Sequence, residues 1–297
     1  MKFSFNLYKE MTMVALESEF GKENIKEISI TKNNGVIKEG VNILEKDKRI
    51  APVIYFDTTK EIYDERDVSG FLEQALYACR EVQHLEKQGL EKIFDWEVVK
   101  KFLRPRVINY DANCLRLRCV PYVRRMDLAV TFCVEVTTLL STDDKRVATV
   151  DVSNFMVNLW NVDLETIYHQ AMENLEGAGY YIKSIRDFLT GYQISEPEEK
   201  LNAEILELFV VTCYDGIGGA AAILSSKLLK KFSEEINCPK VYILPSSVHE
   251  IILVDAEKAE VPVLKSIVVD VNKNEVSPIE YLSDSVYYFS EGLLEVV

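Results

Sequence analysis

One short segment gathers the residue types that acyl-transfer enzymes use. Ser246, Ser247, His249 and Glu250 place two hydroxyls, an imidazole and a carboxylate within five residues, and hydrolases use such groups as nucleophile, base and orienting acid. In an extended chain, however, Ser246 and His249 point to opposite faces, and the Cβ atoms of Ser247 and His249 lie about 7 Å apart. The segment also lacks the G-x-S-x-G nucleophile elbow. A turn joining two strands is therefore the favoured interpretation, and catalysis is the alternative.

A second candidate site is the glycine-rich segment at 215–219. It follows an apolar strand and precedes a predicted helix, a position where backbone N–H groups bind phosphate. Gly216, Gly218 and Gly219 are thus candidate ligand-binding residues. The segment matches neither G-x-G-x-x-G nor G-x-x-x-x-G-K-[ST], and no lysine follows it. Positive φ and close helix packing explain these glycines more simply.

A third candidate is a cluster of arginines on an otherwise acidic chain. Six arginines fall in one short segment: Arg104, Arg106, Arg116, Arg118, Arg124 and Arg125. Arg116, Arg118, Arg124 and Arg125 are the candidates for contacts with nucleic acid. The net charge is −14, and residues 195–297 hold 18 acidic against 8 basic side chains. A polyanion is repelled at long range, so ion pairs between the arginines and the acidic C-terminal third are expected instead.

Cysteine and histidine spacing argues against metals and disulfides. The six cysteines form no CxxC pair and lie in or beside apolar stretches, which predicts buried free thiols in a reducing compartment. The three histidines are scattered, so neither a metal nor a cofactor is expected. No apolar run approaches the roughly 20 residues that span a bilayer, and residues 1–10 lack a signal-peptide pattern. A cytoplasmic protein is expected, with no membrane partner.

The spacing of apolar residues alternates between helical and strand-like periods along the chain. Helices are predicted over 69–89 with Ser69 as the N-cap, and over 95–103, 154–160, 164–175, 182–189, 220–236 and 261–271. Strands are predicted within 26–57 with an Asn34-Gly35 hairpin turn, within 106–138 including 115–119, and over 147–152, 205–213, 240–244, 249–254 and 285–289.

These elements predict an α+β protein with mixed or antiparallel sheets, packed helices and two subdomains. The polar, glutamate-rich stretch 191–202 has no apolar periodicity and coincides with the change in charge. It is predicted to link an N-terminal α+β domain, 1–190, to a C-terminal acidic α/β domain, 203–297.

Several short motifs occur together in one order along nearly the whole chain. They are Lys32-Asn33-Asn34-Gly35, Ile50-Ala51-Pro52-Val53-Ile54-Tyr55, Arg104-Pro105-Arg106-Val107-Ile108-Asn109, Asp127-Leu128-Ala129-Val130, Gly219-Ala220-Ala221, the 242–250 segment and the 282–288 segment. In these motifs the chain resembles an uncharacterised bacterial domain family of unknown function, typical of anaerobic gut bacteria and their mobile elements. The resemblance implies an intact fold and supplies no catalytic residues.

The leading functional hypothesis is a non-catalytic, cytoplasmic protein that binds another protein as a regulator or inhibitor. Polarised charge suits recognition of a basic protein surface, and the resemblance extends the expectation to a product of a mobile element. The alternative is a hydrolase or nucleotide-binding enzyme whose pocket lies between the 216–219 turn and the 246–250 turn. Nucleic-acid binding through the arginine segment is a third hypothesis.

Overall fold

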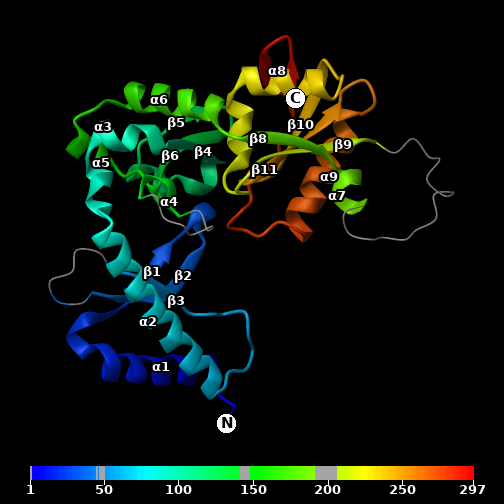
Figure 1. The fold of residues 1–297 in the computed structure, drawn as a ribbon. Helices are drawn as coiled ribbons and strands as arrows, with labels where there is room; N and C mark the ends of the chain where they lie inside the picture. Colours follow the sequence, from blue (N-terminus) through cyan, green and yellow to red (C-terminus); the bar gives the residue numbers. More distant parts are fainter. Residues whose placement is uncertain (1, 45, 47–50, 141–147, 191–205) are drawn as a thin grey trace. The chain divides into compact units, whose positions relative to one another are not determined.

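The computed structural model describes residues 2–44, 46, 51–140, 148–190 and 206–297. Contacts group the chain into two units (Figure 1). The first comprises Met1–Lys32 and Val36–Glu91, and the second comprises Asn33–Gly35 and Lys92–Val297. The predicted linker, 191–202, lies outside the described residues.

The first unit packs two helices on a small antiparallel sheet. Its elements are α1 (Phe5–Phe20), β1 (Ile25–Thr31), β2 (Ile37–Ile43), β3 (Val53–Tyr55) and α2 (Glu65–Lys87). Aromatic side chains fill the core: the Tyr8 and Tyr63 rings stack with centroids 4.5 Å apart, and the Phe56 and Phe71 rings stack at 4.9 Å.

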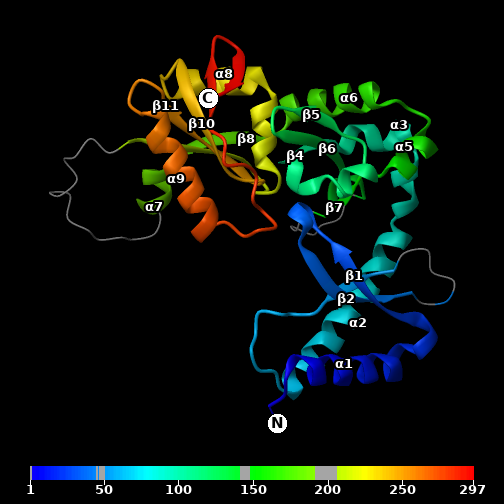
Figure 2. The same cartoon turned by 180° about the vertical axis from the view of Figure 1, so that it is seen from behind.

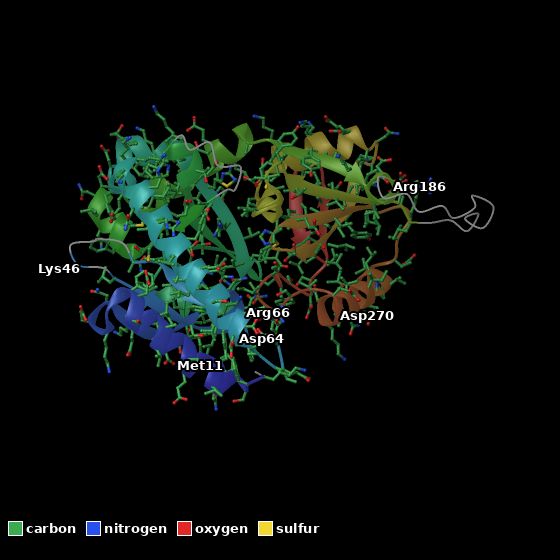
Figure 3. The ribbon with its side chains drawn as sticks, turned by 60° about the horizontal axis from the view of Figure 1, so that its bottom comes forward. Met11, Lys46, Asp64, Arg66, Arg186 and Asp270 are labelled. Carbon is green, nitrogen blue, oxygen red and sulfur yellow. The ribbon has the colours of Figure 1, made fainter. Side chains whose placement is uncertain are left out.

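Both helices of this unit differ from the sequence expectation. Asp64, five residues before Ser69, caps α2, because Asp64 and Asp67 form a reciprocal capping box. Asp64 and Arg66 lie together at this helix start (Figure 3). No helix is predicted from the sequence over the residues of α1. Its buried stripe is Tyr8, Thr12 and Leu16, and the threonine interrupts the apolar periodicity on which the prediction relies.

The first sheet of the second unit has β6 at its centre. β4 (Leu103–Asn109) pairs along one edge of β6 (Leu128–Glu135), and both β5 (Val123–Arg125) and β7 (Thr149–Asp151) also pair with β6. The accompanying helices are α3 (Trp96–Val99), α4 (Val136–Leu139), α5 (Asn154–Trp160) and α6 (Leu164–Gly177). Asp95, Ser153 and Asp163 cap α3, α5 and α6 through side-chain bonds.

The second sheet has the strand order β13-β12-β10-β11-β9-β8, with every neighbouring pair antiparallel. Its strands are β8 (Tyr180–Ser184), β9 (Leu208–Cys213), β10 (Lys240–Ser247), β11 (Glu250–Asp255), β12 (Tyr287–Ser290) and β13 (Leu293–Val296). Its helices are α7 (Ile185–Thr190), α8 (Ser226–Glu235) and α9 (Val261–Asn274).

Alternation along these strands sends apolar side chains to both faces of the sheet. Val241 and Ile243 of β10 join the core beneath α8, whereas Leu244 joins a second cluster with Leu264 and Val268 of α9. α9 therefore covers the face opposite α8 (Figure 2). This two-sided burial explains why both faces of β10 and β11 are hydrophobic.

The six-stranded sheet includes a strand from each side of the predicted domain boundary. β8 precedes residues 191–202 and β9 follows them, yet Tyr180 pairs with Cys213 and Ser184 with Phe209. The contact units consequently divide the chain near residue 92, whereas composition and charge predicted a boundary at 191–202. Composition does not report strand pairing, which depends on backbone hydrogen bonds.

The α+β class is confirmed, and three local predictions need correction. Residues 115–119 contain the 3-10 helix Arg116–Arg118 instead of a strand. The predicted helix 182–189 begins as β8 and becomes helical only in α7. The predicted helix 220–236 is divided into a 3-10 segment, Gly219–Leu224, and α8, because Ser225 caps a new helix there. No helix of the described chain is long and apolar enough to cross a membrane.

Asp127 joins the two sheets of the second unit through hydrogen bonds. Its carboxylate accepts bonds from the hydroxyls of Ser283 at 2.5 Å, Ser285 at 3.0 Å and Tyr287 at 2.8 Å. Ser283 and Tyr287 are fully buried. Asp127 stands immediately before β6, so these bonds fix the start of β6 against the segment that leads into β12.

Replacing Asp127 with alanine is expected to lower the free energy of unfolding by about 3 kcal/mol, because buried hydroxyls lose a charged acceptor. Urea unfolding measures the loss. Asp111→Ala, an exposed aspartate in the same unit, is the matched control and is expected to change stability by less than about 0.5 kcal/mol. Equal effects in the two variants would contradict this role for Asp127.

Candidate functional site

The two turns singled out in the sequence meet in space. The N–H of Gly218 donates to Nδ1 of His249 at 3.2 Å, and the Thr212 hydroxyl donates to the His249 carbonyl at 2.9 Å. A Cβ atom on Gly219 would lie 2.4 Å from that carbonyl oxygen, so only glycine permits this approach. The glycines therefore serve close packing here, and Gly216 and Gly218 also adopt positive φ.

Hydrogen bonds in the 246–250 turn differ from those of a catalytic triad. The Ser246 hydroxyl donates to a Glu250 carboxylate oxygen at 3.1 Å, and the Ser247 hydroxyl accepts from the His249 N–H at 3.0 Å. Since Nδ1 of His249 accepts a backbone bond, a neutral ring carries its proton on Nε2, which lies 3.8 Å from Glu280. A triad base has the opposite tautomer, with Nε2 free to accept from the nucleophile.

Two adjoining cavities lie next to these turns. The larger, about 420 Å³, lies among β4, the end of α6, the start of β8 and the 216–219 turn. The smaller, about 130 Å³, lies between the 216–219 turn, His249 and β4. Arg106, Ile217 and Gly218 line both. The larger cavity has the size typical of small-molecule sites.

Arg104 carries the main electrostatic link at the larger cavity. Its guanidinium contacts Glu135 of β6 and, at 2.5 Å, Asp215 of the glycine turn. Burial tends to lower the pKa of Arg104, but these two carboxylates raise it above its ordinary value. Burial likewise opposes ionisation of Asp215, yet the bonds from Cys213, Arg104 and the Ile217 N–H lower the pKa of Asp215 overall.

The other arginines of the segment have different partners. Arg106 and Arg116 both contact Asp151 of β7, at 3.0 Å and 2.5 Å. Arg124 lies over the Tyr110 ring, 4.0 Å from its centroid, and Arg125 lies 5.7 Å from the centroid of the Tyr168 ring. Arg118 is exposed. Among the described ion pairs, the expected pairing with the acidic C-terminal third is realised by Arg104 with Asp215.

None of the six cysteines, all of which lie among the described residues, forms a disulfide, and they fall into two groups. Cys79, Cys133, Cys213 and Cys238 are buried as expected, but Cys114 and Cys119 are exposed. Burial raises the pKa of Cys133 and of Cys213 to about 11, and the neighbouring Asp215 carboxylate contributes to the shift at Cys213. These thiols stay protonated near neutral pH, so they are poor nucleophiles there. The described residues contain no group of three or more His, Cys, Asp or Glu placed to hold a metal.

A further surface feature, which apolar periodicity does not reveal, is the exposed flank of α9 beside its buried side. Leu264 and Val268 are buried against the sheet, while Val263, Ile267 and Val271 remain 56%, 43% and 37% exposed. Because these three residues are spaced four apart, they form one stripe along the helix, here called the α9 stripe. Val261–Asn274 is apolar on more sides than its buried contacts require, and this excess over a normal amphipathic pattern is the signal in the sequence.

The fold and these surfaces define an α+β protein with two units, one of which contains two antiparallel sheets. Residues 5–291 match a family of unknown function, DUF5688, and the chain belongs to this family. No curated protein and no solved structure matches the chain. The resemblance drawn from the sequence motifs is consistent with this membership.

The raised pKa of Cys213 predicts a specific loss of stability in alkali. The pKa rises from its ordinary 9.0 to about 11 on folding, so the unfolded chain releases this proton first as pH increases. The stabilisation is complete below pH 9.0 and is lost as pH rises through about 11. We expect the free energy of unfolding to fall less steeply over this range in Cys213→Ser than in the wild type.

Urea unfolding across this pH range measures the difference. Cys119→Ser is the control because Cys119 is exposed, and its pH dependence is expected to match the wild type. A Cys213→Ser slope equal to the wild-type slope would contradict the assignment of a buried, protonated thiol.

Proposed function

We propose that this protein is a non-catalytic binding protein, a regulator or inhibitor, that recognises a basic segment of another protein through the α9 stripe. The observation that carries the proposal is the exposure of Val263, Ile267 and Val271 along one flank of a helix whose adjoining side, with Leu264 and Val268, is packed. Contiguous exposed apolar side chains occur more often at interaction sites than on the rest of a protein's surface.

The chemistry of the partner follows from the charges beside the stripe. Asp270 lies three residues after Ile267 within the helix, so helical spacing places its carboxylate next to the stripe. Glu260 and Glu275 are the capping residues at the two ends of the same helix. All three are exposed, and Asp270 is labelled on α9 in Figure 3. Residues 255–297 carry nine acidic and three basic side chains and no arginine. An amphipathic segment with apolar anchors and flanking Lys or Arg complements this surface.

The apolar contribution is of useful size. Complete burial of an exposed Val or Ile side chain stabilises by about 1.5–3 kcal/mol. The side chains of Val263, Ile267 and Val271 are each roughly half exposed, so covering one of them contributes about half of this amount. Covering them contributes on the order of 3 kcal/mol in total, so charge complementarity and further contacts must supply the remainder against the entropy of association. This points to a regulated association that depends on salt concentration.

An enzymatic role is the second candidate, because the 216–219 and 246–250 turns line one cavity as that hypothesis requires. The tautomer of His249 favours the structural interpretation of this turn. The two candidates differ in their response to His249→Ala, which removes the acceptor of the Gly218 N–H and leaves α9 unchanged.

Substitution of the stripe tests the proposal. Tagged wild type, Ile267→Asp and Leu159→Asp would be used for affinity purification from native lysate, with a photo-crosslinking residue at Val263. Leu159, a leucine of similar exposure on α5 of the same unit (51% against 43% for Ile267), controls for a charge placed on an exposed apolar site. We expect Ile267→Asp to reduce retention of one protein about tenfold or more, with crosslinks to a Lys/Arg-rich segment and with weaker retention at high salt.

Retention that is the same for Ile267→Asp and wild type would overturn the proposal. So would the absence of any retained protein, or crosslinks between two copies of this chain together with a dimer in light scattering. A small molecule retained by wild type but lost in His249→Ala, without a protein partner, would support the enzyme instead.

A further inference from the structure

The three-stranded sheet of the first unit carries an inference that is independent of α9. One face of this sheet is packed: Val41, Ile43 and Ile54 belong to a core that also contains side chains of α1 and α2. α2 lies in front of β1 and β2 in Figure 1 and behind them in Figure 2. No described helix of this unit therefore covers the other face, here called the open sheet face.

Strand register identifies the side chains of the open sheet face. Successive residues of a strand alternate between the two faces, and directly opposite residues share a face. Val41 pairs with Glu27 and Ile54, and its set faces the core. The remaining set forms the open sheet face: Lys26, Ile28 and Ile30 of β1, Lys38, Gly40 and Asn42 of β2, and Val53 and Tyr55 of β3.

The sheet separates its charges by face. On the covered face, Lys9 of α1 contacts Glu27 and, at 2.8 Å, Glu39. The strand residues of the open sheet face include Lys26 and Lys38 and no carboxylate. Both lysines are exposed, and neither forms an ion pair within the described part of the chain.

A third cation lies at the end of β1. Lys32 follows this strand directly, and its Nζ lies 4.5 Å from the centroid of the Tyr55 ring, a cation–π contact that holds it on the same face. The open sheet face is thus positive, although the whole chain carries a net charge of −14.

Apolar side chains lie between these lysines. Ile28, Ile30, Val53 and Tyr55 are all partly exposed. The solvent face of an antiparallel sheet is usually polar, and contiguous apolar side chains with a polar rim are typical of interaction sites. The open sheet face therefore combines an apolar centre with a basic rim.

This combination distinguishes between two kinds of anionic partner. Single-stranded nucleic acid binds where several aromatic rings stack on successive bases, but Tyr55 is the single aromatic residue among the strand residues of this face, and Lys32 already lies over its ring. An acidic amphipathic protein segment requires an apolar surface with flanking cations. Long-range repulsion by the acidic chain also acts more strongly on a polyanion than on a short acidic segment.

We propose that the open sheet face binds an acidic amphipathic segment of another protein. The apolar side chains of that segment lie against Ile28, Ile30 and Val53, and its carboxylates contact Lys26 and Lys38. This site is separate from the α9 stripe and takes a segment of the opposite charge.

Fluorescence anisotropy on the full chain tests the proposal with a labelled synthetic peptide that has leucines at helical spacing and glutamates between them. The comparison probes are the same peptide with glutamine in place of glutamate, and a single-stranded oligothymidine. The variants are Lys38→Glu and its matched control Lys87→Glu, an exposed lysine on α2 of the same unit. Ile28→Ser removes part of the apolar centre, Ile267→Asp disables the α9 stripe, and thermal melting confirms that each variant folds.

We expect saturable binding of the glutamate peptide that weakens with salt and is weaker by about fivefold or more in Lys38→Glu, because an attraction becomes a repulsion. Affinity should also fall in Ile28→Ser and with the glutamine peptide, and it should be unchanged in Lys87→Glu and Ile267→Asp. Lack of saturable binding to the wild type, or equal affinity in Lys38→Glu and Lys87→Glu, overturns the proposal. Tighter binding of oligothymidine than of the glutamate peptide, lost in Lys38→Glu, overturns the choice of a protein partner.

Discussion

The close approach of Gly219 to the 246–250 turn is the contact on which the second unit depends. A side chain at this position would collide with the His249 carbonyl, the Thr212 hydroxyl and the Cys213 nitrogen at once. With glycine there, the following residues 220–223 are buried in a core that also contains Val107 and Leu128 of the first sheet and strands of the second. One hydrophobic core therefore serves both sheets, and the two cavities adjoin the turns that this contact brings together.

Polar side chains then fix the loops around that core. Asn34 donates to the carbonyls of Pro278 and Tyr281, and Asn113 donates to the side chain of Asn34. Asn109 donates to the carbonyl of Leu282, close to the serines that bond Asp127. Because buried backbone carbonyls need partners, these amides and the Asp127 carboxylate decide the path of the 276–286 segment. The sequence motifs that carry the family resemblance thus include residues that meet here in space.

The parts of the structure that periodicity determines were predictable from the sequence. The helix over 154–160, the three strands within 26–57 and the strand–turn order of the C-terminal third follow from apolar spacing, and the start of α6 follows from Asp163. Elements whose buried residues break the pattern were missed: Thr12 interrupts the stripe of α1, and β8 pairs with a strand beyond residues 191–205. Residue spacing also could not show that Gly218 would bond His249, because the two residues are 31 positions apart in the sequence and meet only through tertiary packing. In the sequence, the α9 stripe appeared only as an excess of apolar residues. Helical periodicity identifies the helix but does not show which of its apolar side chains stay exposed.

Hydrogen exchange on Gly219→Ala tests most directly whether this glycine makes the two sheets one cooperative body. We expect faster exchange of backbone amides in β4 and β6 as well as in β9, β10 and β11, because the shared core must open around the new methyl group, while α1 and α2 of the first unit keep their protection. Faster exchange confined to the six-stranded sheet, with β4 and β6 protected as in the wild type, would contradict it.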